Sequence, residues 1–82
     1  MTDTIDASGV YRVTITPGQA KVLREFMRDG ASNAEIATRM FLAEDTVKAH
    51  MKQIMRRTGC VSRTALAIDL FRQRVTVHVE ER

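Results

Sequence analysis

The chain has 82 residues, one cysteine and a formal net charge of +3. This length predicts one small domain with a modest core, and a lone cysteine excludes both an intrachain disulfide and a cysteine-based zinc site. Between residues 16 and 74, eleven Lys and Arg stand against six Asp and Glu, a balance of +5. A basic centre indicates a polyanionic partner, either nucleic acid or an anionic membrane. No apolar run is long enough for a signal peptide or a membrane span, so we expect a cytoplasmic protein.

The N-terminal part of the chain changes character at residue 10. Residues 1–9 are polar without a period and predict a flexible segment, so we expect a single domain over residues 10–82. Apolar and polar residues then alternate over residues 10–15, which is the pattern of a strand. The apolar row of this strand is Tyr11, Val13 and Ile15.

Two helices with clear end signals follow. Thr16 suits an N-cap, Pro17 suits the first helical position, and Gly30 suits the C-cap of the first helix. Ser32 and Glu35 form a capping box at the start of a second, shorter helix that reaches Arg39 or Met40. The apolar faces of the two helices are Ala20, Leu23, Phe26 and Met27, then Ile36, Ala37 and Met40.

A short turn over residues 41–43 leads into the stretch EDTVKAHMKQIMRRT, residues 44–58, which predicts a third helix closed by Gly59. Spacings of three and four place an apolar stripe on one side, and the basic residues four apart lie on another. The apolar stripe is Val47, Met51, Ile54, Met55 and Thr58, and the basic side holds Lys48, Lys52 and Arg56 beside the short Ala49. Two helices joined by such a turn form a helix-turn-helix, and the major groove of DNA admits one helix. A solvated charged face is the plainer alternative.

Ser62 caps a fourth helix that runs from Arg63 to about Gln73. Its apolar residues cover much of its circumference, so one side can meet the core and the other is a candidate dimer contact. The residues assigned to that contact are Ala65, Ile68, Asp69 and Arg72. Arg63, at the helix N-terminus, is a candidate for a DNA phosphate contact.

A second alternation covers residues 74–80, with Val75, Val77 and Val79 in one row. An isolated strand with one apolar face is not stable in water. We therefore expect residues 10–15 and 74–80 to pair as an antiparallel ribbon whose valine face packs on the first and fourth helices. Pairing between two subunits and two disordered tails are the alternatives.

Residues that would support enzyme chemistry are lacking in the sequence. There is no glycine-rich phosphate loop, no catalytic carboxylate pair and no metal-ligand cluster, and His50 and Cys60 have no third partner. We predict that the protein is not an enzyme and uses no cofactor or metal. Cys60 is expected to pack as a small apolar residue beside Gly59.

From Ile15 to about Phe71, the order and spacing of TPGQAKVL, GASNAEIA, DTVKAHMKQI and SRT resemble the LuxR/GerE-type (NarL-like) DNA-binding domain of bacterial regulators. This resemblance implies a mainly α, four-helix domain that binds duplex DNA through its third helix, commonly as a homodimer through its last helix. Residues 1–14 leave no room for a receiver or sensor domain, so we expect a stand-alone domain. Ala43 departs from the family, which usually has a Ser or Thr cap there.

The resemblance also implies roles for individual residues. Lys48, Ala49 and Lys52 match the positions that meet bases, and Asn33, Thr46 and His50 match positions near the phosphates. We assign Arg56, at the far end of the basic side, to the phosphates as well.

The resulting hypothesis is a bacterial or phage transcription regulator that binds duplex DNA sequence-specifically and without a membrane partner. The alternative is an adaptor that binds RNA polymerase or another regulator without reading DNA. The basic third helix separates the two, since a pure adaptor has no need of it.

Overall fold

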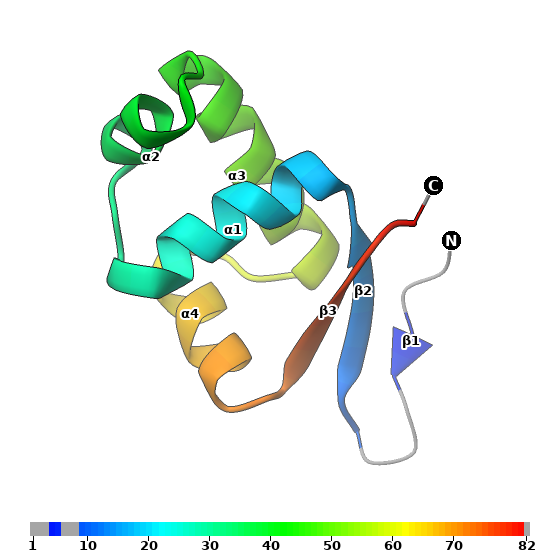
Figure 1. Ribbon diagram of the computed structural model, residues 1–82. Coiled ribbons are helices and arrows are strands. Elements are labelled where there is room, and N and C mark those ends of the chain that lie inside the picture. Colours follow the sequence, from blue (N-terminus) through cyan, green and yellow to red (C-terminus); the bar gives the residue numbers. More distant parts are fainter. Residues whose placement is uncertain (1–3, 6–8, 82) are drawn as a thin grey trace.

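Four helices and three short strands follow one another in the computed structural model of the protein, which describes residues 4–5 and 9–81 (Figure 1). The elements are β1 (Thr4–Ile5), β2 (Tyr11–Ile15), α1 (Pro17–Asp29), α2 (Asn33–Met40), α3 (Glu44–Thr58), α4 (Arg63–Phe71) and β3 (Val75–Val79). The predicted fold, a four-helix domain with short strands at both ends, is confirmed. Of the segment expected to be flexible, residues 1–3 and 6–8 lie outside the described residues, and Thr4–Ile5 pair with β2.

The caps of α1 and α2 lie where the end signals predict them. The Thr16 side chain accepts from the N–H of Gln19 and the Gln19 side chain accepts from the N–H of Thr16, a capping box that sequence reasoning missed. Ser32 and Glu35 form the predicted capping box of α2. Gly30 adopts a left-handed conformation, with φ of 68°, that glycine reaches without the penalty a side chain would impose.

The core forms where α1, α2, α3, α4 and the inner face of the sheet meet. Its most completely buried side chains are Val13, Ile15, Val22, Ile36, Val47, Met51, Ile54 and Leu66. Val22 takes the place in the core that the sequence pattern assigned to Met27, whose side chain is exposed. The Thr58 hydroxyl, which is buried with the stripe of α3, donates to the carbonyl of Ile54 at 3.0 Å and so carries no unpaired polar group into the core.

The strands β2 and β3 pair within one chain, and they run parallel (Figure 1). The predicted antiparallel direction is therefore wrong. Alternation shows which side chains share a face but does not encode strand direction. The four helices intervene, and after α4 the chain returns beside the start of β2, where the N–H of Tyr11 donates to the carbonyl of Arg74 at 2.9 Å. From that point β3 can follow β2 only in the same direction.

The valine row of β3 faces the helices, as predicted. Val75 belongs to the core, Val77 packs against it, and Val79 is half exposed. The fourth helix ends at Phe71, two residues before the predicted end, because Gln73 adopts a left-handed φ of 58°. The N–H of Arg74 then donates to the carbonyl of Asp69, and this turn sends the chain into β3.

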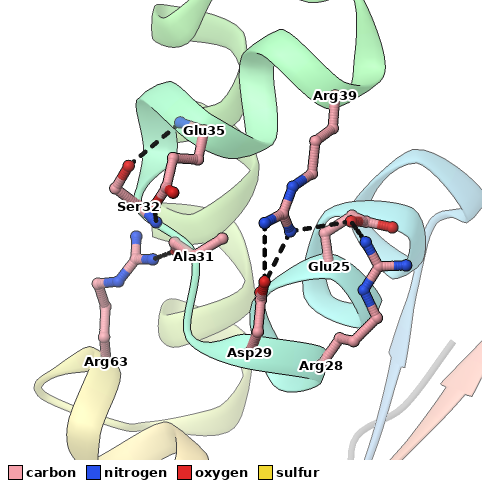
Figure 2. Close-up of polar contacts among 8 residues, drawn as sticks. All are labelled: Glu25, Arg28, Asp29, Ala31, Ser32, Glu35, Arg39 and Arg63. Carbon is pink, nitrogen blue, oxygen red and sulfur yellow. Dashed lines mark hydrogen bonds and ion pairs between the residues drawn. The ribbon is translucent and has the colours of Figure 1, made fainter.

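An ionic cluster ties α1 to α2 (Figure 2). The guanidinium of Arg39 donates to both carboxylate oxygens of Asp29, at 3.1 and 2.7 Å, and to Glu25 at 3.3 Å. Glu25 also pairs with Arg28 at 3.1 Å. The hydrogen bond from Arg39 lowers the pKa of Asp29, so the pair keeps its charge at neutral pH. The cluster is partly solvated and fixes orientation more than it stabilises. No helix in the described part of the chain is long and apolar enough to cross a membrane.

The difference between Val75 and Val79 yields a test of the packing of β3. Val75 is 5% exposed and Val79 is 47% exposed, although both belong to the same row of the same strand. We expect Val75→Ala to lower the free energy of unfolding by about 1.5 kcal/mol, since two buried carbons are lost. The matched control Val79→Ala should cost less than about half of that. Equal effects in chemical denaturation would mean that the start of β3 is not packed on the helices.

Candidate nucleic-acid interface

The third helix has one buried face and one exposed face. Val47, Met51 and Ile54 are almost fully buried, and they pack toward α1, α2, α4 and β2. The predicted contacts on the opposite side, Lys48 and Lys52, lie in solvent. Because successive turns repeat every 3.6 residues, burying the first set orients the second set outward.

The exposed side combines charge with one short residue. Besides the two lysines it presents Ala49 and Arg56, both exposed. Glu44 lies one turn before Lys48, with 3.6 Å between carboxylate and ammonium, a solvated pair that binds weakly. Short Ala49 lets the helix backbone approach a surface closely, while the long stems of its neighbours can reach past it. Such a face fits a groove lined by anions.

Of Thr46 and His50, which are predicted to lie near phosphates, His50 lies beside α1 and Thr46 lies one turn before it. Thr46 is exposed in the first turn. The His50 ring lies beside Gly18, where a Cβ built on the glycine would be 3.4 Å from Cε1. Gly18 and His50 line a shallow hollow that Lys21 and Phe41 share. Sequence reasoning did not single out Lys21, because one lysine on the wet side of a helix carries no signal.

Asn33 and Arg63, the other predicted phosphate contacts, are brought together with α1. One guanidinium nitrogen of Arg63 donates to the side-chain oxygen of Asn33, and the other donates to the carbonyl of Ala31 at 2.7 Å (Figure 2 shows the second bond). The guanidinium carbon also lies 4.6 Å from the ring centre of Phe26. Arg63 therefore anchors the start of α4 to the loop before α2. This contact joins residues 30 positions apart, so no local pattern could reveal it.

The predicted dimer contacts on α4 differ in exposure. Ile68 is 44% exposed and Arg72 is exposed, whereas Ala65 is half-buried. Asp69 faces inward toward Cys60, whose sulfur lies 3.6 Å from its carboxylate. Burial raises the pKa of the Cys60 thiol, so it stays protonated and unreactive beside the core at neutral pH. Phe71, which is 85% exposed, was not among the assigned residues.

Metal binding finds no support among the residues that the structure describes. In that part of the chain, no three His, Cys, Asp or Glu side chains gather in a way that could hold an ion.

Comparison with known sequences gives a family match. The sequence model described as bacterial regulatory proteins, luxR family, matches residues 13–70. The chain is 41% identical over 59 residues to the HTH-type transcriptional regulator AlkS of Ectopseudomonas oleovorans. The aligned segment covers 72% of this chain and 7% of that protein. It is 35% identical over 60 residues to a nitrate/nitrite response regulator protein homolog of Haemophilus influenzae, covering 73% of this chain and 28% of that one.

A further relative is the DNA-binding transcriptional activator DevR/DosR of Mycobacterium tuberculosis, 38% identical over 50 residues, or 61% of this chain and 23% of the relative. The chain thus spans less than a third of the length of each of these relatives. No solved structure matches the chain significantly.

The N-terminus of α3 yields a prediction about stability. Ala43 has the extended conformation of an N-cap, with φ of −69° and ψ of 146°, but offers no side-chain hydrogen bond. Ala43→Ser should raise the free energy of unfolding by about 1 kcal/mol, because the hydroxyl can accept from an unsatisfied N–H of the first turn. Ala49→Ser, in the exposed middle of the same helix, is the control and should give no gain. An unchanged melting temperature for Ala43→Ser would contradict the cap.

Arg63 yields a second prediction. Arg63→Ala should destabilise the domain by about 2 kcal/mol, since Ala31 and Asn33 lose a charged donor. Arg63→Lys should recover little of the lost stability, because an ammonium cannot donate to Asn33 and Ala31 at the same time in this geometry and cannot stack on Phe26. Thermal unfolding of both variants measures the effect. Wild-type stability of Arg63→Ala would show that the guanidinium is not an anchor.

Proposed function

The chain belongs to the LuxR family of bacterial regulatory proteins, and on that premise we propose that it is a transcription regulator that binds duplex DNA sequence-specifically. In this proposal α3 enters the major groove with its exposed side toward the base edges. The observation that carries the proposal is the division of α3 into a side buried at Val47, Met51 and Ile54 and a solvated basic side. A helix held in this way can enter a groove without losing any of its core contacts.

Base reading is assigned to the middle of the exposed side. Lys48 and Lys52 can donate to the O6 and N7 acceptors of guanine, and the methyl group of Ala49 can contact the methyl group of thymine. These three residues lie within five positions of one helix, so one insertion presents all of them to adjacent base pairs. Lys48 must exchange its weak pairing with Glu44 for the base contact, which costs little in solvent.

Phosphate contacts are assigned to the residues that border this patch. Thr46 is exposed one turn before His50, which lies beside α1, and Arg56 lies at the opposite end of the basic side. These contacts would fix the register of the helix without carrying sequence information. Lys21 shares the hollow beside His50 and is a further candidate for the same strand of phosphates.

Asn33 and Arg63 have a different part in the proposal. Since the guanidinium of Arg63 is bonded to Asn33 and Ala31, a phosphate contact by Arg63 would need to break or share these bonds. We therefore propose that Arg63 acts mainly by positioning the start of α2, and that Asn33, which is half-buried, meets a phosphate through its remaining amide group.

A single domain of this size makes few base contacts, so we propose that it acts as a homodimer. The proposed contact centres on the exposed Ile68 and Arg72 and has half-buried Ala65 at its border, whereas Asp69, whose carboxylate lies beside Cys60, is left out of it. Two copies would then read half-sites roughly 34 Å apart from centre to centre.

The proposal is tested first by selecting bound duplexes from a random pool and then by binding measurements with single variants. Lys48→Ala and Lys52→Ala should each reduce discrimination between the selected site and a site with one changed guanine by about 1–3 kcal/mol. Arg56→Ala should weaken binding to both sites alike and lower the salt slope by about 1, because one phosphate contact is lost.

The matched control is Arg24→Ala, which removes one exposed positive charge from α1 outside the proposed interface. It should leave discrimination unchanged. If Lys48→Ala and Lys52→Ala bind the selected site as wild type does, α3 is not the reading helix. If no duplex is enriched at low salt, the adaptor function, with RNA polymerase or another regulator as partner, replaces DNA binding.

A further inference from the structure

In the described part of the chain, the sheet ends in β3, whose outer edge has no neighbouring strand. Among the described residues the strand order is β1-β2-β3, so β3 is an edge. The five residues of β3 are VTVHV, rich in the β-branched side chains that favour pairing. An open edge of this kind presents N–H and C=O groups to any strand of matching shape.

The hydrogen-bond pattern shows which groups of β3 point outward. The residues just before and just after β3 bond to β2. The carbonyl of Arg74 accepts from the N–H of Tyr11 at 2.9 Å, and the N–H of Glu80 donates to the carbonyl of Ile15 at 2.8 Å. In a parallel ladder the bonding residues alternate, so the even-numbered residues face β2. The N–H and C=O groups of Val75, Val77 and Val79 therefore point to the open edge.

We propose that β3 joins two copies of this chain edge to edge, antiparallel and centred on Val77, so that their sheets become one continuous sheet. In this register Val77 lies opposite Val77 of the partner subunit, and Val75 lies opposite Val79 of the partner subunit. Thr76 lies opposite His78 of the partner subunit on the other face. The strand is thus complementary to itself, as a two-fold contact requires. The outward groups of Val77 exchange both hydrogen bonds with their counterparts.

The charged residues that flank β3 are also complementary between two copies. Arg74 precedes β3 and Glu80 follows it, and the same register places Arg74 opposite Glu80 of the partner subunit at both ends of the joint. Opposite charges directly across a ladder favour pairing, whereas like charges disfavour it. A parallel arrangement of two β3 strands would instead set Arg74 beside Arg74 and Glu80 beside Glu80.

An apolar hollow beside β3 favours the same partner. It has a volume of about 290 Å³ and lies between the sheet and α1, lined by Leu23, Met27, Leu70, Val77 and Val79, among others. Val79 and Met27 are exposed there. The valine row of an added strand would face the same side of the sheet and so cover this hollow. This contact uses a different surface from the exposed side of α4, and it does not depend on DNA binding.

Cysteine cross-linking tests the register in the full chain. In a Cys60→Ser background, which removes the only native thiol, Val77→Cys should give a covalent dimer under mild oxidation. Opposed residues that exchange hydrogen bonds lie about 5.5 Å apart at Cα, within the span of a disulfide. The control Val79→Cys should cross-link at least about tenfold more slowly, because its two thiols would lie roughly 13 Å apart along the strands.

Charge exchange supplies a second, independent test. Arg74→Glu and Glu80→Arg should each weaken self-association in sedimentation experiments by about fivefold, and the double exchange should restore it. Melting temperatures close to that of the unmodified chain would establish that the variants remain folded. Equal cross-linking at positions 77 and 79 would overturn the β3 contact. A double exchange as weak as the single ones would overturn it too.

Discussion

The side chains of Val47, Met51 and Ile54 hold the domain together, because the other helices and β2 meet on them. Their burial fixes the rotation of α3 about its own axis, and that rotation decides which side chains remain in solvent. A rotation of α3 about its axis that exposed these side chains would cost several kcal/mol of stability, because their apolar surface would return to water. The basic side is therefore not free to face inward. The proposed DNA-reading surface is a direct consequence of how the core is packed.

Polar contacts at the other side of the domain fix α2 relative to α1 and α4, while α2 packs directly on α3. Arg39 binds Asp29 and Glu25 of α1, and Arg63 binds the loop before α2 (Figure 2). The Arg63 guanidinium also stacks on Phe26. Each arginine uses a planar, multidentate contact that specifies geometry more narrowly than apolar packing does. Together they hold α2, the first helix of the helix-turn-helix, in one place relative to α1 and α4. A reading helix depends on neighbours that are held in place, because an error of about one ångström in its position would move its side chains away from the base edges.

The features of the fold that the sequence predicted correctly are those determined by residues close together in the chain. The caps at Thr16, Ser32 and Gly59 act within one turn, and the stripe of α3 repeats within four residues, so the helices and their faces followed from short patterns. Strand direction has no local cause, and the antiparallel ribbon was wrong for that reason. The anchoring contact of Arg63 with Asn33 likewise joins distant residues, so no local pattern indicated it. The roles of individual side chains on DNA remain predictions.

The most direct measurement of the central proposal is the change in backbone amide NMR signals when a selected duplex is added to the isotope-labelled chain. If α3 enters the major groove, the largest changes will fall on the exposed side of α3, at Lys48, Ala49 and Lys52, with smaller ones at Thr46 and Arg56. They should weaken steeply as salt is raised, because binding releases counterions. Changes concentrated on α4 or β3, with α3 unaffected, would contradict the account.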